Sequence, residues 1–301
     1  MSTNADMTAG KAATLDTKIE SGIDALYNLR GHPDRDPTYA KFVVRSEQLR
    51  TALASRSQLD IPYASHPRAR LDVFHATTPR AVLVFFHGGY WRALEKSIFS
   101  FIAAPFVEAG ISVVMPQYPL APEATITDIT EHAHSAVSWV QSSTLAPLPI
   151  IVSGHSAGGH LAAMCALDDK LHANISGMIP ISGLFDLVPL CKTNVNVDVR
   201  MDEETAGAMS PARLRHDNAT PALIMVGGDE TDGFKWQTRH YADVLDSVGA
   251  QVQVIEAPGL NHFTILNPLA DATTKMHREV MSFISHCLAT SELTSPPVKI
   301  T

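Results

Sequence analysis

A short glycine-rich stretch around Ser156 has the residue types of a nucleophilic site. The sequence GHSAG at 154–158 follows the apolar run 149–153 and precedes an alanine-rich stretch, 157–167, that favours helix. A strand, a sharp turn and a helix in this order predict a nucleophile elbow, where the serine sits at a strained backbone position flanked by glycines. Ser156 is therefore the predicted nucleophile of an acyl-transfer reaction.

A pair of glycines upstream could stabilise the negative charge that such a reaction develops. The run 81–86 is apolar throughout, as expected for a central strand covered on both faces, and HGGYW follows it at once. Glycines let bare backbone amides approach an oxyanion. We expect an oxyanion hole formed by the amides of Gly88, Gly89 and Ala157. His87 is interpreted as a residue that orients this loop, not as a base.

The base and the acid should follow later strands. His262 lies on a Pro- and Gly-containing loop after the predicted strand 251–255 and is the predicted base. Three carboxylates follow the predicted strand 222–226, and residue type alone does not choose among them: Asp229, Glu230 and Asp232. Asp186 is a further candidate for the acid, although a role in a turn or as a helix cap suits it better. His160, one turn after Ser156, is interpreted as a packed helix residue.

The remaining pattern predicts the elements that must position these groups. Predicted strands alternate with predicted helices such as 96–109, 234–248 and 272–289, and most strands are apolar throughout. This pattern predicts an α/β fold with a mostly parallel central sheet, helices on both faces, and a shared site at the carboxyl ends of the strands. Two further predicted helices, 19–29 and 39–55, precede the sheet and either pack against it or cap the site.

The domain organisation follows from the same pattern. We expect a flexible tail over 1–17, a single domain over 18–290 and a second tail over 291–301.

Composition narrows the class of protein. The chain has 301 residues and a net charge of −8, which argues against nucleic acid and anionic membranes as partners. Its three cysteines are widely spaced and form no disulfide framework or metal motif. No apolar stretch typical of a signal peptide or a membrane span is evident, so we expect a cytoplasmic protein. No cofactor is expected, the predicted partner is a small-molecule substrate, and a homodimer is compatible with the sequence.

Metal catalysis is the competing mechanism. The sequence contains no H-E-x-x-H motif, and Glu131, His132 and His134 fall in a predicted amphipathic helix, away from any strand end. A solvated helix face explains these residues, so we predict chemistry without a metal.

With these residues in place, the chain resembles the α/β-hydrolase superfamily over about 61–288, and more narrowly its kynurenine formamidase (arylformamidase) group. The shared stretches are HGGYW at 87–91, GHSAGGHLA at 154–162, ISGLFDL at 181–187, 226–234 and NHF at 261–263. The resemblance implies that Glu230 is the acid, where many members carry Asp. YPLAPE at 118–123 is similar to the YRLAPE element of hormone-sensitive-lipase-like carboxylesterases, with Pro119 in place of Arg.

The motifs and the resemblance together predict a metal-independent serine hydrolase with the triad Ser156, Glu230 and His262. It implies cleavage of a small, aryl-bearing formamide or amide through an acyl-enzyme; a carboxylesterase or carbamate hydrolase is the alternative, and a catalytically inactive ligand receptor is a third reading. Four aromatic residues could line the substrate pocket or belong to the core: Tyr90, Trp91, Phe185 and Phe263.

Overall fold

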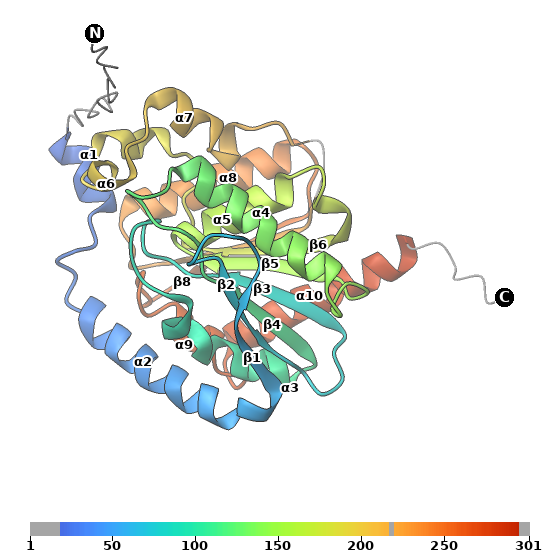
Figure 1. Cartoon of the computed structure of the whole chain (residues 1–301). Coiled ribbons are helices and arrows are strands. Elements are labelled where there is room, and N and C mark those ends of the chain that lie inside the picture. The colour runs from blue at the N-terminus through green and yellow to red at the C-terminus, as the bar shows by residue number, and fades with distance from the viewer. Residues whose placement is uncertain (1–18, 217–219, 295–301) are drawn as a thin grey trace, which may run out of the picture.

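The computed structural model describes residues 19–216 and 220–294 and shows one eight-stranded sheet between two layers of helices (Figure 1). The strand order is β1-β2-β4-β3-β5-β6-β7-β8, and only β2 runs antiparallel to its neighbours. The expected α/β fold with a mostly parallel sheet is confirmed. The strands are β1 Ser57–Pro62, β2 Arg70–Phe74, β3 Ala81–Phe86, β4 Ile111–Pro116, β5 Ile150–His155, β6 Ile175–Ile181, β7 Ala222–Gly227 and β8 Val252–Ala257.

The helices cover both faces of the sheet. In Figure 1, α4, α5 and α8 lie together on one side, and α2, α3 and α10 on the other. The main helices are α1 Ser21–Tyr27, α2 Arg35–Ala52, α3 Ala103–Glu108, α4 Ile126–Ser142, α5 Ala157–Leu167, α8 Asp232–Ser247 and α10 Lys275–Thr294, and three short ones are α6 Asn196–Val199, α7 Glu203–Ala208 and α9 Leu266–Leu269.

The alternation of side chains along β3 explains why the sheet needs both layers. Val82, Val84 and Phe86 belong to the core shared with α4, α5 and α8, whereas Leu83 and Phe85 belong to the core shared with α2, α3 and α10. Successive side chains of a strand point to opposite faces, so a strand that is apolar throughout requires cover on both.

The helix predicted over 96–109 is two elements. A 3-10 helix, η2 (Lys96–Ile102), leads into α3, and Pro105 stands in the first turn of α3. A proline lacks the backbone N–H that a continuous α-helix would need at this position, but in a first turn that donor has no intrahelical partner in any case. Helix α4 begins after Thr125, whose Oγ1 accepts from the Asp128 amide at 3.1 Å while the Asp128 side chain accepts from the Thr125 amide at 2.9 Å.

The ends of the domain differ slightly from expectation. Helix α10 begins at Lys275, because the Thr274 hydroxyl accepts from the His277 amide, and it runs to Thr294 instead of ending at 289. The first four residues of the predicted C-terminal tail are therefore helical. The rest of that tail and the predicted N-terminal tail lie outside the described residues.

Candidate active site

Ser156 occupies a sharp turn between β5 and α5. Its backbone has φ 58° and ψ −120°, a conformation that side-chain-bearing residues rarely adopt. A Cβ on Gly158 would lie 2.0 Å from the Phe86 carbonyl oxygen, and one on Gly154 would lie 2.3 Å from the Gly158 carbonyl oxygen. The glycines are therefore required because β5, α5 and β3 approach one another at the turn more closely than a methyl group permits.

His262 and Glu230 form a buried pair beside this turn. The His262 Nδ1 lies 2.6 Å from the Glu230 Oε2, and both side chains are almost inaccessible. The other carboxylate oxygen of Glu230 accepts from the Gly227 amide at 2.8 Å and from the Ser182 hydroxyl at 2.5 Å. Glu230 is thus held by two donors on one oxygen and can accept the imidazole N–H on the other, which fixes the tautomer of His262.

The other candidate acids lie elsewhere. Asp229 is exposed, and Asp232 is an exposed first-turn residue of α8 that pairs with Lys235 at 3.0 Å. Asp186 accepts two hydrogen bonds of 2.8 Å from the Arg213 guanidinium. Among these candidates, the structure brings only Glu230 to His262.

His155 supports the histidine loop, a contact that the sequence reasoning did not anticipate. Its Nε2 lies 2.8 Å from the His262 carbonyl oxygen, and the two rings are 4.6 Å apart. Burial lowers the pKa of His155 well below its usual value, and the neighbouring His262 lowers it further. A neutral ring can donate to this carbonyl only through Nε2–H, which leaves the buried, partnerless Nδ1 unprotonated. The variable position of the G-x-S-x-G pattern is the signal that could have pointed to this residue. Ser182, whose hydroxyl donates to Glu230, is the second residue that the sequence analysis did not identify, and it lies just after β6.

The loop after β3 lies directly over the serine. A Cβ on Gly88 would lie 2.9 Å from the His155 carbonyl oxygen and 3.1 Å from the Ser156 Cβ, and Gly89 has φ 116°. The predicted amide donors Gly88 and Gly89 are therefore on a segment that contacts the turn, while Ala157 begins α5.

His87 is packed as a structural residue of this loop. Its ring stacks on Tyr118 at 4.4 Å, and its Nδ1 lies 2.7 Å from the Gly88 carbonyl oxygen. Tyr118 in turn donates to the His87 carbonyl at 2.7 Å. Burial lowers the pKa of His87 to about 4, so the ring is neutral near pH 7. These contacts agree with its interpretation as an orienting residue.

Ser156 and His262 open into one cavity of about 220 Å³. Of the four aromatic residues predicted for the pocket, Tyr90 and Phe263 line this cavity. Its other lining residues are Asp24, Tyr27, Asn28, Leu29, Arg30, Arg35, Tyr39, Gly89, Arg92, Ala93, Leu94, Asn194 and Val195.

Trp91 and Phe185 belong to the core instead, which corrects their assignment to the pocket. Trp91 is fully buried, and its Nε1 donates to the His160 Nδ1 at 3.2 Å. Phe185 is also fully buried and stacks on Tyr241 with ring centroids 4.4 Å apart. His160 donates through Nε2 to the Met209 carbonyl at 2.8 Å, as expected for a packed helix residue. The ring partners of Trp91 and Phe185, His160 and Tyr241, come from the helices α5 and α8.

The N-terminal segment forms part of the cavity wall. The Tyr90 hydroxyl donates to the Tyr27 carbonyl at 2.5 Å, and the Asn194 amide donates to the Asp24 carboxylate at 2.7 Å. Tyr39 of α2, which also lines the cavity, packs edge-on against Phe263 with ring centroids 5.7 Å apart. The segment with the short helices α6 and α7, in which the sequence predicted no element, supplies Asn194 and Val195.

The described residues contain neither a cluster of metal ligands nor a membrane-spanning helix. Across 19–216 and 220–294, no three His, Cys, Asp or Glu side chains come together as a group that could hold a metal ion. No helix in the same residues has the length and apolarity needed to cross a membrane. His132 and His134 lie on α4, where His134 pairs with Asp168 at 3.3 Å.

The fold and the geometry of the site are those of an α/β hydrolase. The model of the α/β-hydrolase fold family matches residues 83–266, more than half of the chain, and the chain belongs to this family. The match begins in β3 and ends beyond His262, so it includes the elbow, the glycine loop and the histidine loop.

Relatives by sequence narrow the family. The chain is 33% identical to a kynurenine formamidase of Salmo salar over 61% of its own length and 66% of that protein. It is 32% identical to a kynurenine formamidase of Danio rerio, over 65% of the chain and 70% of that protein. A carboxylesterase/phospholipase of Mycobacterium tuberculosis, LipF, is 24% identical over 62% of the chain and 56% of that protein. Both resemblances found in the sequence are confirmed.

A solved structure shows how far the similarity extends in space. A proposed thioesterase from Silicibacter sp. TM1040 superposes with a TM-score of 0.79 at 31% identity, covering 86% of this chain and 98% of that one. The likeness therefore includes most of the described fold.

Proposed function

We propose that the protein is a serine hydrolase that cleaves a small formamide or related amide through an acyl-enzyme. The observation that carries the proposal is the buried His262–Glu230 pair, 2.6 Å apart, beside a serine that opens with His262 into one cavity. The relatives named kynurenine formamidase favour a formamide bond among the bonds such a site can break.

In the proposed mechanism, His262 Nε2 accepts the Ser156 hydroxyl proton as Oγ attacks the carbonyl carbon. The oxygen of the tetrahedral intermediate accepts hydrogen bonds from the amides of Gly88, Gly89 and Ala157. His262 then returns the proton to the departing amine nitrogen, the C–N bond breaks, and Ser156 carries the formyl group as an ester. Water, deprotonated by His262, releases formate and restores the hydroxyl.

The environment of His262 suits both halves of this cycle. Glu230 accepts from Nδ1–H, so Nε2 has a free lone pair in the resting enzyme, and the carboxylate stabilises the imidazolium when Nε2 takes the proton. Four aromatic residues line the cavity, which suits an aryl group on the leaving amine: Tyr27, Tyr39, Tyr90 and Phe263.

A carboxylesterase is the second candidate, because the same residues transfer an acyl group from an ester and the relative LipF is named a carboxylesterase/phospholipase. Turnover of an aryl formamide and of a short aryl ester should be compared under one set of conditions. We expect kcat/KM to be higher for the formamide; negligible formamide turnover beside rapid ester turnover would reject the formamidase assignment.

The serine-hydrolase assignment has its own test. A fluorophosphonate probe should label the wild-type chain at Ser156 and leave Ser156→Ala unlabelled. Absence of an adduct on a folded wild-type protein would contradict both candidate activities and favour a ligand-binding role.

A further inference from the structure

A second cleft of about 280 Å³ shares no lining residue with the cavity at Ser156. Its walls come from α2, from the residues around the start of β2, from the start of η2, and from Gln117 after β4. Four of its lining residues are cations, in a chain whose net charge is −8. The lining residues are Arg50, Asp60, Pro67, Arg68, Arg70, Glu95, Lys96, Ser97 and Gln117.

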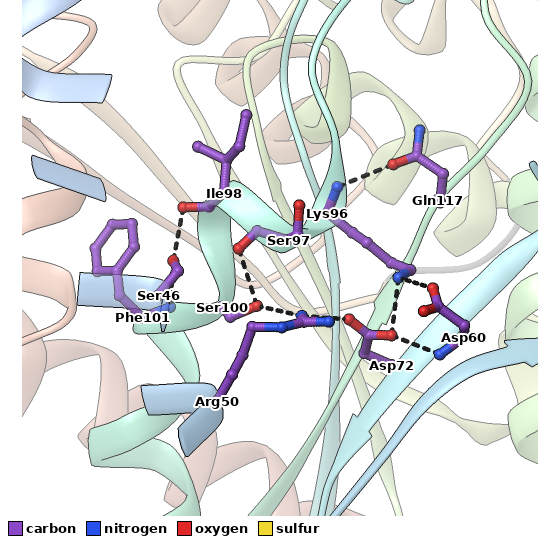
Figure 2. Close-up of polar contacts among 10 residues, drawn as sticks. All are labelled: Ser46, Arg50, Asp60, Asp72, Lys96, Ser97, Ile98, Ser100, Phe101 and Gln117. Carbon is purple, nitrogen blue, oxygen red and sulfur yellow. Dashed lines mark hydrogen bonds and ion pairs between the residues drawn. The ribbon is translucent and has the colours of Figure 1, made fainter. Parts of the chain in front are cut away.

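Two of the cations belong to a charge cluster that is already balanced (Figure 2). The fully buried Asp72 carboxylate accepts from Arg50 at 2.6 Å and from the Lys96 ammonium at 2.8 Å. Lys96 also pairs with Asp60 at 2.6 Å. Because two cations pair with two carboxylates, this cluster has no net charge with which to attract a ligand. Its ion pairs nevertheless hold one wall of the cleft in place.

The other two cations, Arg68 and Arg70, lack such partners. Arg68 donates at 3.4 Å to the backbone carbonyls of Tyr118 and Leu94, and Arg70 donates at 3.1 and 3.5 Å to those of Ala69 and His66. Most of these distances are long for a charged donor, which prefers about 2.7–2.9 Å to an anionic oxygen. Within the described part of the chain, neither guanidinium pairs with a carboxylate, although the exposed Glu95 also lines the cleft.

The cations of the cleft contribute to the low pKa values of two neighbouring groups. The hydrogen bond from Lys96 lowers the pKa of Asp60, and the charges of Arg50 and Arg70 lower it further. Burial is the main cause of the low pKa of His87, and the charges of Arg68 and Lys96 add to the effect.

We propose that this cleft binds a phosphate group through the guanidinium groups of Arg68 and Arg70, with Lys96 and Arg50 behind them. A guanidinium offers parallel N–H donors that match two phosphate oxygens, and two of them balance the charge of a phosphate near pH 7. The cleft is several times larger than the roughly 30 Å³ that one water molecule occupies in the liquid, so it has room for a small phosphomonoester as well as for the free ion.

The test is calorimetric titration of the full chain with inorganic phosphate and, separately, with glycerol 3-phosphate, at constant ionic strength. We expect saturable binding of one ligand per chain, and the tighter of the two ligands distinguishes a free ion from an esterified phosphate. Arg68→Gln and Arg70→Gln should each weaken binding about tenfold or more, because each removes a charged pair of donors. Arg239→Gln, on the exposed face of α8, should bind as wild type.

Three outcomes would overturn the proposal. They are no saturable heat in the wild type, undiminished binding in both cleft variants, or loss of binding in Arg35→Gln alone, which would place the phosphate in the cavity beside Ser156. Thermal unfolding without ligand shows whether each variant is folded. If Arg68→Gln does not fold, Arg70→Gln still tests the proposal. The measurement does not depend on hydrolysis, so Ser156→Ala should bind phosphate normally whether or not the proposed function holds.

Discussion

The orientation of the His262 ring depends on the carboxylate of Glu230. One oxygen accepts from Ser182 and Gly227, so the side chain cannot turn away without leaving two buried donors unpaired. The other oxygen lies 2.6 Å from the His262 Nδ1, which leaves Nε2 outside this hydrogen bond. This geometry supports the proposed roles of Glu230 as the acid and His262 as the base.

Glu230→Gln should reduce kcat by a factor on the order of 10⁴. A glutamine can present its NH₂ to His262 Nδ1, which favours the tautomer whose proton sits on Nε2, where the Ser156 proton must go. Steady-state kinetics measure the effect. Asp229→Asn is the matched control, since Asp229 is exposed and should leave kcat within about twofold of wild type. Equal losses in the two variants would contradict the assignment of the acid.

At the scale of elements, the segment that joins α1 to α2 is attached to the loop that carries His262. The Asn261 Nδ2 donates to the Asp34 carboxylate at 2.7 Å, and the His32 ring lies 5.3 Å from that of Phe263. The same Asn261 uses its Oδ1 to accept from the amides of Phe263 and Thr264, which shapes the turn around His262. The N-terminal segment is therefore linked mechanically to the proposed base.

Asp34→Ala should lower kcat/KM on the order of fivefold, because an exposed hydrogen bond to a charged group contributes about 1 kcal/mol. The thermal midpoint should change little, since Asp34 is at the surface. Glu47→Ala, an exposed carboxylate on the outer face of α2, is the control and should match wild type. If the two variants behave alike, the contact between Asp34 and Asn261 does not support the site.

For the whole molecule, several histidines are buried as neutral groups. Burial lowers the pKa values of His87 and His160 to about 4, from the usual value near 6.5. Between these values the unfolded chain binds a proton at each position and the folded chain does not. Stability is therefore unaffected by these groups above about pH 6.5 and decreases as the pH falls from 6.5 to about 4.

Each such histidine should contribute a slope of about 1.4 kcal/mol of unfolding free energy per pH unit within that range. Denaturant unfolding of wild type and His160→Gln from pH 7 to pH 4.5 measures the slope, and the variant should lose the share of one histidine while being less stable throughout. His286→Gln, at an exposed position, should keep the wild-type slope. An unchanged slope in His160→Gln would show that His160 titrates normally in the folded protein.

Local order in the sequence determined the fold class, the turn at Ser156, the glycine loop and the position of His262. The turn and the glycine loop follow from residues within a few positions of one another, because each joins a buried apolar strand to glycines that a close approach requires. The fold class follows from the alternation of predicted strands and helices along the chain, and His262 from its place after the last predicted strand. Family resemblance added Glu230, which residue type alone could not separate from Asp229 and Asp232.

Only the tertiary structure decided the points that depend on distant residues. It separated the carboxylates by burial, because Ser182 and Gly227 satisfy Glu230 alone. It also showed that Trp91 and Phe185 are buried in the core and that the N-terminal segment lines the cavity. These outcomes arise from packing between elements that lie far apart in the chain, and no local pattern of residue types encodes which side chains will meet there.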